Sequence, residues 1–421
     1  MPGTLRRQIE GSQAVAAAVA RCRPEVICAY PITPQTHIVE ALSRLARQGD
    51  LGTAEVINVE SEFAAMSVSI GASAAGARAY TATASQGLLY MAEALFNAAG
   101  LGLPIVMTVA NRAIGAPINI WNDHSDAMAL RDCGWIQLYV TDNQEATDVH
   151  VQAFRIAEEL STPVMVCMDG FVLTHAFEPL EVPDQETVDA FLPPFQPRQV
   201  LDPDDPMTIG AMVGPEAFTE VRYLQHAKQI QALDVIPRVA AEFAEQFGRR
   251  SGGLLDCYQS ADAETIIIAL GSVNGTLAEV IDEQREQGRS VGALALKSFR
   301  PFPTEEIRAA LAPARRVIVL ERSLAVGIGG IVCENVRGAV AGRPTAVHTV
   351  IAGLGGRAIT RRSLTGLLAT ARTGDLGELT FLDLDREIVE RELVREREGG
   401  RPGPHAEAIL HDLGVVAAGP V

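Results

Sequence analysis

The sequence has few of the short motifs that assign a catalytic or cofactor site by themselves. Its six cysteines, at 22, 28, 133, 167, 257 and 333, include no pair with the C-x-x-C spacing of iron–sulfur runs and structural zinc sites. Neither G-x-G-x-x-G nor a Walker A loop occurs, which excludes the commonest nucleotide-binding loops. We therefore expect no metal ligands and no disulfide framework in this chain, and a reducing compartment, the cytoplasm.

Lysine is scarce and acidic residues are in excess. Lys228 and Lys297 are the only lysines, and the net charge is −17. A surface this acidic repels nucleic acids and anionic membranes, so neither is expected as a partner. The longest apolar stretch, Ala94–Ala110, is interrupted by asparagine, glycine and proline and predicts no membrane span. Arg6 and Arg7 precede no apolar core, so no secretory signal is predicted.

The chain does have a repeated alternation of short apolar runs and helical patterns. In the first third, strands are expected over 26–30, 54–59, 78–82, 104–110, 135–140 and 163–168. Strands that alternate with helices predict a parallel sheet covered on both faces, and hence an α/β fold. Ser61 is expected to cap an alanine-rich helix that extends to about Ala75. Another helix is expected over Gln86–Ala99.

The length of 421 residues is comfortable for two to three domains. Prolines between Glu178 and Pro206 predict an extended linker, and the polar segment Phe218–Phe247 a connecting helix, not a core helix. A second α/β unit starts near Ala263, with strands expected over 265–270, 290–296, 316–321 and 346–351. We therefore expect domains at 1–250, with the linker at about 178–250, and at 260–380. Residues 383–421 should form a charged arm that is loosely ordered or held by a partner.

Two motifs follow the first two expected strands. Ligands of parallel α/β sheets bind beyond the carboxyl ends of the strands, where Tyr30–Pro34 lies. Thr33 in this turn either contacts a ligand or caps the next helix, with Pro34 at its first position. The second motif ends in Glu62, which is either a partner of the helix dipole or a reactive group. No charged residue occurs between Glu62 and Arg78, so Glu62 stands at the mouth of a buried helix, where its proton can be used.

Two further motifs follow the third and fourth strands. In Thr83–Gly87, the glycine would let the backbone approach a ligand. Arg112 comes directly after a buried strand, and a guanidinium there can grip a carboxylate through two parallel hydrogen bonds. The alternative is a structural ion pair with Asp123 or Asp126. His124 has no second histidine at a suitable spacing, so no metal site is predicted there.

In this order, the four motifs resemble the α subunit of the pyruvate:ferredoxin oxidoreductases and their 2-oxoacid relatives. Ala116–His124 is especially similar to the multi-subunit pyruvate type. In the second unit, the similar segments are Ala269–Ser272, Phe299–Pro303 and Ile351–Gly356, so the resemblance covers about residues 10 to 375. It implies a pyrimidine-side thiamine diphosphate domain followed by a domain like the C-terminal one of transketolase.

The resemblance also implies roles for individual residues. Glu62 matches the carboxylate that bonds N1′ of the cofactor's aminopyrimidine ring and promotes deprotonation at C2. Thr33 and Arg112 match residues near the 2-oxoacid, with Arg112 gripping its carboxylate. The cofactor-binding residues implied are Pro31, Thr33, Glu62, Ser85 and Gln86.

The sequence departs from the family pattern beside these residues. Phe63 stands where pyruvate-type enzymes have a histidine, and Ile114-Gly115 replaces a Leu-Ser-like pair next to Arg112. We include Phe63 among the substrate-binding residues. Besides pyruvate, a larger or aromatic 2-oxoacid such as phenylglyoxylate is an alternative substrate.

The chain has no G-D-G…N motif for Mg²⁺ and the diphosphate, and no cysteines for clusters. The resemblance therefore implies a β subunit that supplies the diphosphate and Mg²⁺ half of a shared thiamine diphosphate site. It also implies iron–sulfur and other small subunits with 4Fe–4S clusters, coenzyme A as acyl acceptor, and ferredoxin or another electron acceptor. The expected reaction is oxidative decarboxylation or the reverse carboxylation. The alternatives are a subunit of a non-redox thiamine enzyme and a catalytically silent assembly subunit.

Overall fold

Apolar runs at the expected positions in the N-terminal part of the chain form six strands of a seven-stranded sheet. The computed structural model describes residues 6–398 and 405–415. The strand order is β12-β6-β7-β5-β4-β2-β3, and every pair is parallel except the antiparallel edge strand β12. The strands are β2 (Val26–Ala29), β3 (Glu55–Asn58), β4 (Ala79–Thr83), β5 (Val106–Asn111), β6 (Ile136–Tyr139), β7 (Val164–Asp169) and β12 (Ser298–Arg300).

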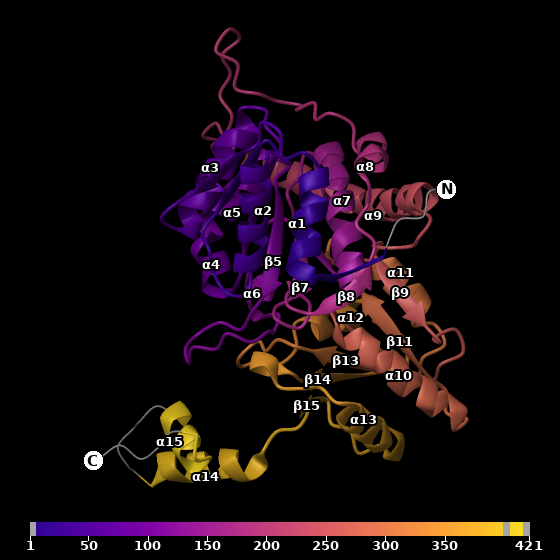
Figure 1. The fold of residues 1–421 in the computed structure, drawn as a ribbon. Coiled ribbons are helices and arrows are strands. Elements are labelled where there is room, and N and C mark those ends of the chain that lie inside the picture. Colours follow the sequence, from indigo (N-terminus) through magenta and orange to yellow (C-terminus); the bar gives the residue numbers. More distant parts are fainter. Residues whose placement is uncertain (1–5, 399–404, 416–421) are drawn as a thin grey trace.

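Helices cover both faces of this sheet (Figure 1). The helices are α1 (Gly11–Arg21), α2 (Thr36–Gln48), α3 (Glu62–Ala74), α4 (Ser85–Tyr90), α5 (Ala92–Leu101), α6 (Ser125–Ala129) and α7 (Asn143–Leu160). One apolar core holds α3 and α5, and the other holds α1, α2 and α7. The single helix expected over Gln86–Ala99 is wrong, because the chain breaks at Met91 into α4 and α5. The cap is confirmed, since Ser61 Oγ accepts a hydrogen bond from the backbone N–H of Ala64 at 3.1 Å.

The proline-rich segment is more structured than a linker. Strand β8 (Phe177–Leu180) pairs antiparallel with β1 (Arg7–Glu10), and α8 (Gln185–Phe191) follows. Helix α9 (Phe218–Phe247) has the predicted bounds, but the expectation that it lies outside the core is wrong for its second half. Val239 and Phe243 are fully buried there, because they continue an apolar stripe that packs on α7.

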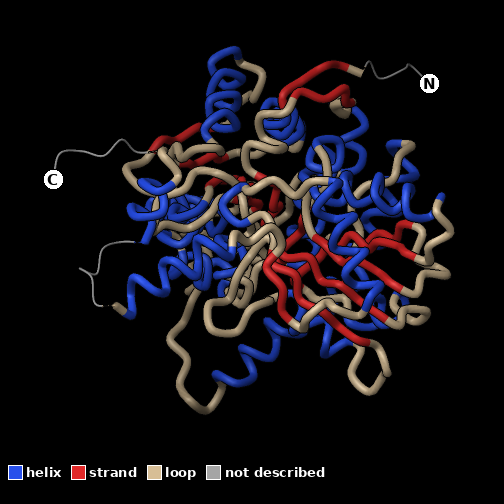
Figure 2. The backbone as a smooth tube through the Cα atoms, turned by 90° about the horizontal axis from the view of Figure 1, so that it is seen from below, coloured by secondary structure: helices blue, strands red, loops and turns tan. Residues whose placement is uncertain are grey.

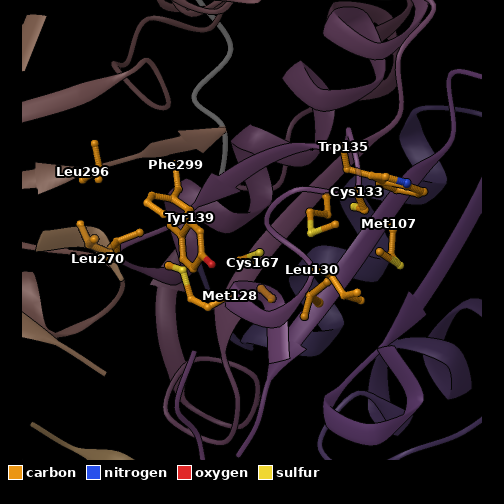
Figure 3. Packing of buried hydrophobic residues seen from close by; sticks show 14 of the residues in the cluster. Met107, Met128, Leu130, Cys133, Trp135, Tyr139, Cys167, Leu270, Leu296 and Phe299 are labelled. Atoms are coloured by element: carbon orange, nitrogen blue, oxygen red, sulfur yellow. The ribbon is translucent and has the colours of Figure 1, made fainter. Parts of the chain in front are cut away.

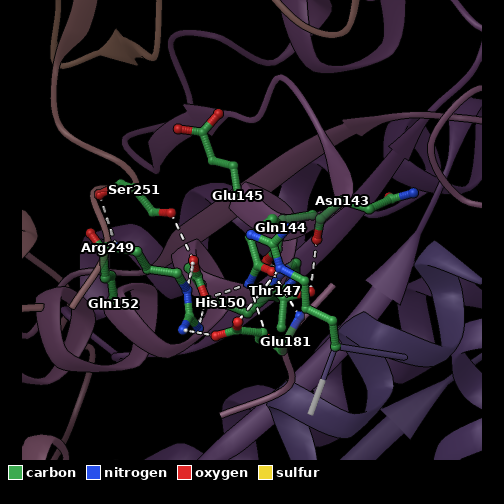
Figure 4. Close-up of polar contacts among 12 residues, drawn as sticks. Asn143, Gln144, Glu145, Thr147, His150, Gln152, Glu181, Arg249 and Ser251 are labelled. Carbon is green, nitrogen blue, oxygen red and sulfur yellow. Dashed lines mark hydrogen bonds and ion pairs between the residues drawn. The ribbon is translucent and has the colours of Figure 1, made fainter. Parts of the chain in front are cut away.

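The chain after α9 is fastened to α7 by a polar network (Figure 4). The carboxylate of Asp148 accepts from Arg249 Nη2 at 2.6 Å and from Ser251 Oγ at 2.7 Å. Arg249 also pairs with Glu181 at 3.4 Å. These hydrogen bonds provide partners for the fully buried carboxylate of Asp148. They also hold the start of the second unit against α7.

The second unit is a six-stranded sheet with the order β15-β14-β13-β10-β11-β9, in which only β9 is antiparallel. Figure 2 shows strands of the molecule in red with helices in blue around them. Its strands are β9 (Leu255–Tyr258), β10 (Thr265–Ala269), β11 (Val291–Leu296), β13 (Arg316–Glu321), β14 (Ala346–Ile351) and β15 (Leu379–Phe381). Its helices are α10 (Val273–Glu286), α11 (Thr304–Ala310), α12 (Val332–Ala339), α13 (Arg361–Thr373) and the 3₁₀ turn η1 (Leu354–Gly356). The predicted α/β fold with two parallel sheets is thus confirmed.

The two sheets share one apolar core (Figure 3). Tyr139 of the first sheet and Leu270 and Leu296 of the second belong to the same cluster of buried side chains. Phe299 lies in β12, which comes from the second half of the sequence but pairs with β6 of the first sheet. This pairing of β12 with β6 links the second unit to the first.

The charged C-terminal segment is helical. Helices α14 (Arg386–Arg397) and α15 (His405–Asp412) lie apart from both sheets (Figure 1). Arg391 and Arg395 of α14 pair with Asp412 of α15 at 2.9 and 2.8 Å. These ion pairs join the two helices, and an arm that is loosely ordered or held by a partner stays a prediction. None of the described helices has the length and apolarity needed to cross a bilayer.

Candidate active site

The four predicted motifs follow four neighbouring strands. Strands β5, β4, β2 and β3 are adjacent and parallel, so their carboxyl ends meet at one edge of the sheet. Arg112 follows β5, Ser85 and Gln86 follow β4, Thr33 follows β2, and Glu62 follows β3. Segments far apart in the sequence therefore meet where parallel α/β sheets bind ligands.

Glu62 is the first residue of α3, and only 7% of its surface is exposed. A Cβ placed on Gly87 would lie 2.6 Å from Oε1 of Glu62 and 2.7 Å from Oγ1 of Thr83. Gly87 thus makes room for the carboxylate, where the sequence had suggested an approach of backbone to ligand. Across the described residues, no group donates a hydrogen bond to Glu62, and the buried hydroxyl of Thr83 also lacks a partner. Two adjacent polar groups without partners indicate a candidate binding site, because buried polar groups are normally paired.

Asp126 holds the loops around this pocket in place through hydrogen bonds. Its fully buried carboxylate accepts from the backbone N–H groups of Ser85 and Arg112, both at 2.9 Å, and from Asn111 Nδ2 at 2.8 Å. Burial raises the pKa of Asp126, and these hydrogen bonds oppose that rise. Ser85 adopts φ 51°, a left-handed conformation that is uncommon for a residue other than glycine. Its hydroxyl bonds the carbonyl of Ala113 at 2.5 Å, so both the backbone and the side chain of Ser85 are held in place.

Arg112 is 7% exposed and forms no ion pair within the described chain. Its Nε donates to the carbonyl of Asn119 at 3.1 Å and its Nη1 to the carbonyl of Thr33 at 2.8 Å. The alternative of a structural ion pair with Asp123 or Asp126 is therefore wrong: Asp126 bonds the backbone of Arg112 and not its guanidinium. The Nη2 group has no hydrogen-bond acceptor in the part of the chain that the structure describes, so it retains donors for a ligand.

Thr33 lies in a turn closed by a hydrogen bond of 2.8 Å from Gln35 N–H to the carbonyl of Ile32. Helix α2 starts at Thr36, so the expectations that Thr33 caps it and that Pro34 opens it are wrong. Instead, the buried Gln35 holds the turn against β4 by donating to the carbonyl of Ala82 at 2.6 Å. Pro31 and Thr33 are exposed at this edge.

Phe63 does not point into the core. It is 38% exposed, and its ring centroid lies 6.2 Å from that of Tyr90. Gln86 is partly buried, and a Cβ on Gly115 would lie 2.7 Å from its Nε2. The structure therefore brings Gln86 to the loop after Arg112, whereas the ring contact of Phe63 among the described residues is with Tyr90.

The second unit closes over the loop that follows Arg112. Gly355 donates its N–H to Asp123 Oδ2 at 3.0 Å, and its carbonyl accepts from Asn119 Nδ2 at 3.2 Å. A Cβ on Gly356 would overlap Trp121. The glycines of η1 thus allow close packing between the two units of the chain.

A buried ionic group fixes the same junction. Asp169, at the end of β7, accepts from Arg322 Nη1 at 2.8 Å, from His124 Nε2 at 2.7 Å and from the N–H of Ser272 at 3.0 Å. Burial alone would raise the pKa of Asp169, but the charge of Arg322 and the hydrogen bond from His124 hold it well below its usual range. Neither this group nor the central role of Asp126 could be predicted from local sequence patterns, because their partners lie up to 153 residues away.

Comparisons with known proteins agree with this arrangement. Residues 17–241 match the family described as pyruvate flavodoxin/ferredoxin oxidoreductase, thiamine diphosphate-binding, and residues 263–364 match pyruvate:ferredoxin oxidoreductase core domain II. The chain is 48% identical to pyruvate synthase subunit PorA of Methanosarcina barkeri, covering 90% of this chain and 97% of the relative. It is 43% identical to the PorA subunit of Thermotoga maritima (88% and 95% covered). It is 39% identical to ketoisovalerate oxidoreductase subunit VorA of Pyrococcus abyssi (85% and 91% covered).

A solved structure of similar fold is the 2-oxoglutarate:ferredoxin oxidoreductase from Magnetococcus marinus with 2-oxoglutarate, coenzyme A and succinyl-CoA bound. The TM-score is 0.67 at 20% sequence identity, and the match covers 86% of this chain and 65% of that one. This likeness supports the fold. The sequence matches confirm the resemblance: the chain is an enzyme subunit of the pyruvate flavodoxin/ferredoxin oxidoreductase family and carries the family's thiamine diphosphate-binding domain.

Proposed function

We propose that this chain is the α subunit of a cytoplasmic, CoA-acylating 2-oxoacid:ferredoxin oxidoreductase that acts on pyruvate or a related 2-oxoacid. The direction is oxidative decarboxylation or the reverse carboxylation. The observation that carries the proposal is Glu62, a buried carboxylate without a partner at the edge where four strands end. The free cysteines, five of them buried, fit a reducing compartment.

The residues at this edge fit the pyrimidine half of thiamine diphosphate. Glu62 can accept a hydrogen bond from a ring nitrogen, and Gly87 leaves the space that its carboxylate needs. Pro31, Thr33 and Gln86 would line the same pocket, with Ser85 holding its loop. No part of this edge offers a motif for Mg²⁺ and the diphosphate. We therefore assign that half of the site to a β subunit.

The chemistry divides between cofactor and protein. When bound, thiamine diphosphate supplies the carbanion chemistry that decarboxylates a 2-oxoacid. Glu62 would hold and exchange a proton at the pyrimidine side, where only 7% of its surface is exposed. The neighbouring Thr83 hydroxyl is a further donor within the pocket.

Arg112 would bind the carboxylate of the 2-oxoacid. Its bonds to the carbonyls of Asn119 and Thr33 hold the guanidinium plane, so the free Nη2 group has a fixed direction. Burial lowers the pKa of Arg112 while Asp126 opposes the change, and a guanidinium remains charged at any physiological pH. Thr33 would stand beside the substrate because its carbonyl is the partner of Arg112.

Pyruvate is the favoured substrate, since the PorA relatives are more similar than VorA. An aromatic 2-oxoacid such as phenylglyoxylate is the second candidate, favoured by the partly exposed ring of Phe63 near Tyr90. The partners proposed are the β subunit, iron–sulfur subunits with 4Fe–4S clusters, coenzyme A, and ferredoxin or another acceptor. We assign 1–250 to the pyrimidine-side domain with its linker, 260–380 to the second domain and 383–421 to the charged arm.

The test is reconstitution of the chain with its partner subunits and measurement of CoA-dependent dye reduction on a panel of 2-oxoacids. Glu62→Gln should lower turnover by about 10²–10⁴-fold, the usual worth of a positioned acid or base, with cofactor still bound. The exposed Glu60, two residues before it, is the matched control, and Glu60→Gln should leave turnover unchanged. An unaffected Glu62→Gln complex would instead indicate a silent assembly subunit. Turnover without coenzyme A or electron acceptor would indicate a non-redox thiamine enzyme.

The proposed division of the cofactor site between two subunits leads to a separate prediction. The chain alone should bind thiamine diphosphate poorly, because the Mg²⁺ and diphosphate half is absent from it. Isothermal titration of the purified chain with thiamine diphosphate and Mg²⁺ measures this directly. Tight, Mg²⁺-dependent binding by the chain alone would contradict the division of the site between subunits.

A further inference from the structure

A second group of ligand-type side chains, Glu10, His37 and His175, lies outside the site described above. They come from the end of β1, the first turn of α2 and the segment after β7. Each offers one possible ligand atom, and the three atoms lie within 4.8 Å of one another. We propose that this group, the Glu10–His37–His175 cluster, binds one divalent transition-metal ion of the Zn²⁺ type. The proposal does not depend on the function proposed above.

The donor set suits such an ion. Neutral imidazole nitrogens together with one carboxylate are ligands that Zn²⁺ and its neighbours prefer, whereas Mg²⁺ and Ca²⁺ prefer oxygen ligands alone. Three protein ligands would leave an open position for water, as in other Zn²⁺ sites with three protein ligands. The cluster is reachable from solvent, since the side chain of His37 is 43% exposed while that of Glu10 is 13% exposed.

The cluster is preassembled in the fold. Nδ1 of His37 lies 2.6 Å from Oε1 of Glu10, which leaves Nε2 of this ring free. The rings of His37 and His175 lie side by side, with centroids 4.4 Å apart and planes 34° apart. The two imidazoles and the carboxylate are thus already close, and side-chain rotations would bring all three onto one ion.

His175 also has the outer hydrogen bond that orients metal-binding histidines. Its Nδ1 lies 2.7 Å from Oγ1 of Thr174, so its Nε2 is the available ligand. Thr174 is itself held, because its Oγ1 accepts from the N–H of Phe171 at 2.8 Å and its carbonyl accepts from Ser12 Oγ at 2.7 Å. Such outer partners fix the ring orientation and are costly to lose in metal sites.

The protonation state of His175 supports the same role. Burial lowers its pKa, the nearby His37 lowers it further, and Glu10 opposes the change. A metal-binding histidine must be neutral, so a lowered pKa keeps the ligand available at neutral pH.

An ion here would fasten three segments close to the candidate active site. Helix α2 directly follows the turn that carries Thr33, so His37 lies four residues beyond it. The ring of Phe171 lies between those of Trp121 and His175, with tilted planes and a centroid distance of 4.8 Å to each. The cluster therefore adjoins both the turn of Thr33 and the loop after Arg112.

The experiment uses the full 421-residue chain, stripped of metals with a chelator. Zn²⁺ is titrated by calorimetry, and Co²⁺ is followed by its visible ligand-field absorption. We expect one ion per chain, with loss of binding in His37→Ala, His175→Ala and Glu10→Gln. Thr174→Val keeps all three ligands but removes the outer hydrogen bond, so it should weaken Zn²⁺ binding by about 10–100-fold.

Two matched controls separate the cluster from the general surface. Glu40→Gln changes an exposed carboxylate on the same helix α2, and His226→Ala changes an exposed histidine on α9. Both should bind Zn²⁺ as the unchanged chain does, with circular dichroism confirming the fold of every variant. The proposal is overturned if the chain binds no Zn²⁺, if Thr174→Val and Glu10→Gln bind normally, or if the two controls weaken binding as much as the cluster variants.

Discussion

Gly87 lies so close to Glu62 that a single added methyl group would occupy the space of the carboxylate, 2.6 Å from Oε1. The glycine is inside helix α4 and has an ordinary helical φ, so alanine is acceptable to the backbone. We expect Gly87→Ala to displace the Glu62 carboxylate and abolish most turnover. The fold should survive, since alanine in a helix stabilises by about 0.5–1 kcal/mol relative to glycine.

The control for this variant is Gly100→Ala in α5, where an added Cβ meets no atom within 4 Å. Turnover of the reconstituted complex and thermal unfolding of the chain are measured for both. Normal turnover by Gly87→Ala would show that the position of the Glu62 carboxylate does not matter for catalysis.

Arg112→Lys tests the substrate carboxylate. Lysine keeps the positive charge but lacks the planar guanidinium. It therefore cannot bond the carbonyls of Asn119 and Thr33 and also present a planar pair of donors to the substrate carboxylate. We expect KM to rise by a similar factor for every 2-oxoacid, because the carboxylate is common to all of them. Steady-state kinetics on several 2-oxoacids check this. A change in KM confined to one acyl group would place Arg112 on the acyl side instead.

Phe63→His tests the choice of acyl group. A partly exposed aromatic ring that contacts an aromatic substrate contributes about 0.5–1.5 kcal/mol beyond area burial. The ratio of kcat/KM between aromatic and small 2-oxoacids should therefore shift roughly 2–13-fold in favour of pyruvate. Competition between pyruvate and phenylglyoxylate gives the ratio directly. An unchanged ratio would assign Phe63 to packing against Tyr90.

Asp169→Asn tests the junction between the two units. Removing this carboxylate leaves the buried Arg322 without its counter-ion, a loss that costs about 3–5 kcal/mol in buried pairs. Asp132→Asn is the control, because Asp132 is 69% exposed in its pair with Arg300 and exposed pairs contribute about 0–1 kcal/mol. Urea unfolding of both variants measures the difference. Equal stabilities would mean that the Asp169 pair adds nothing at the junction.

His150 predicts a pH dependence of stability. It is fully buried between β5 and α7, where Nδ1 donates to the carbonyl of Ala146 and Nε2 accepts from Thr108, both at 2.6 Å. Burial lowers its pKa from 6.5 to about 4. Between these two values the unfolded chain binds the proton and the folded chain does not, so stability falls as the pH falls.

The contribution of His150 should be present in full above pH 6.5 and lost on acidification to pH 4, by about 3 kcal/mol. His150→Gln removes the titrating group and should flatten this part of the profile. The urea midpoints of the two proteins are compared between pH 4 and pH 6.5, which separates the effect of His150 from that of other titrating groups. Parallel profiles would show that His150 does not carry the effect.

Much of the site was predictable because strand ends are local features. An apolar run followed by a polar turn identifies the end of a buried strand, and Thr33, Glu62, Ser85 and Arg112 all lie at such ends. The helix Phe218–Phe247 was predicted to the residue. The break at Met91 was missed because no proline marks it, and the start of α2 was misplaced because Gln35 is held by Ala82, 47 residues away.

The sequence by itself determined the α/β alternation, the family and the residues at the strand ends, because these depend on short-range pattern and on side-chain type. Only the tertiary structure decided what those residues touch. Gly87 makes room for Glu62, Asp126 holds two loops at once, and β12 joins a sheet built from the other half of the chain. Such contacts join residues 14 to 163 positions apart, and the packing that selects them is a property of the folded core, not of any segment of the chain.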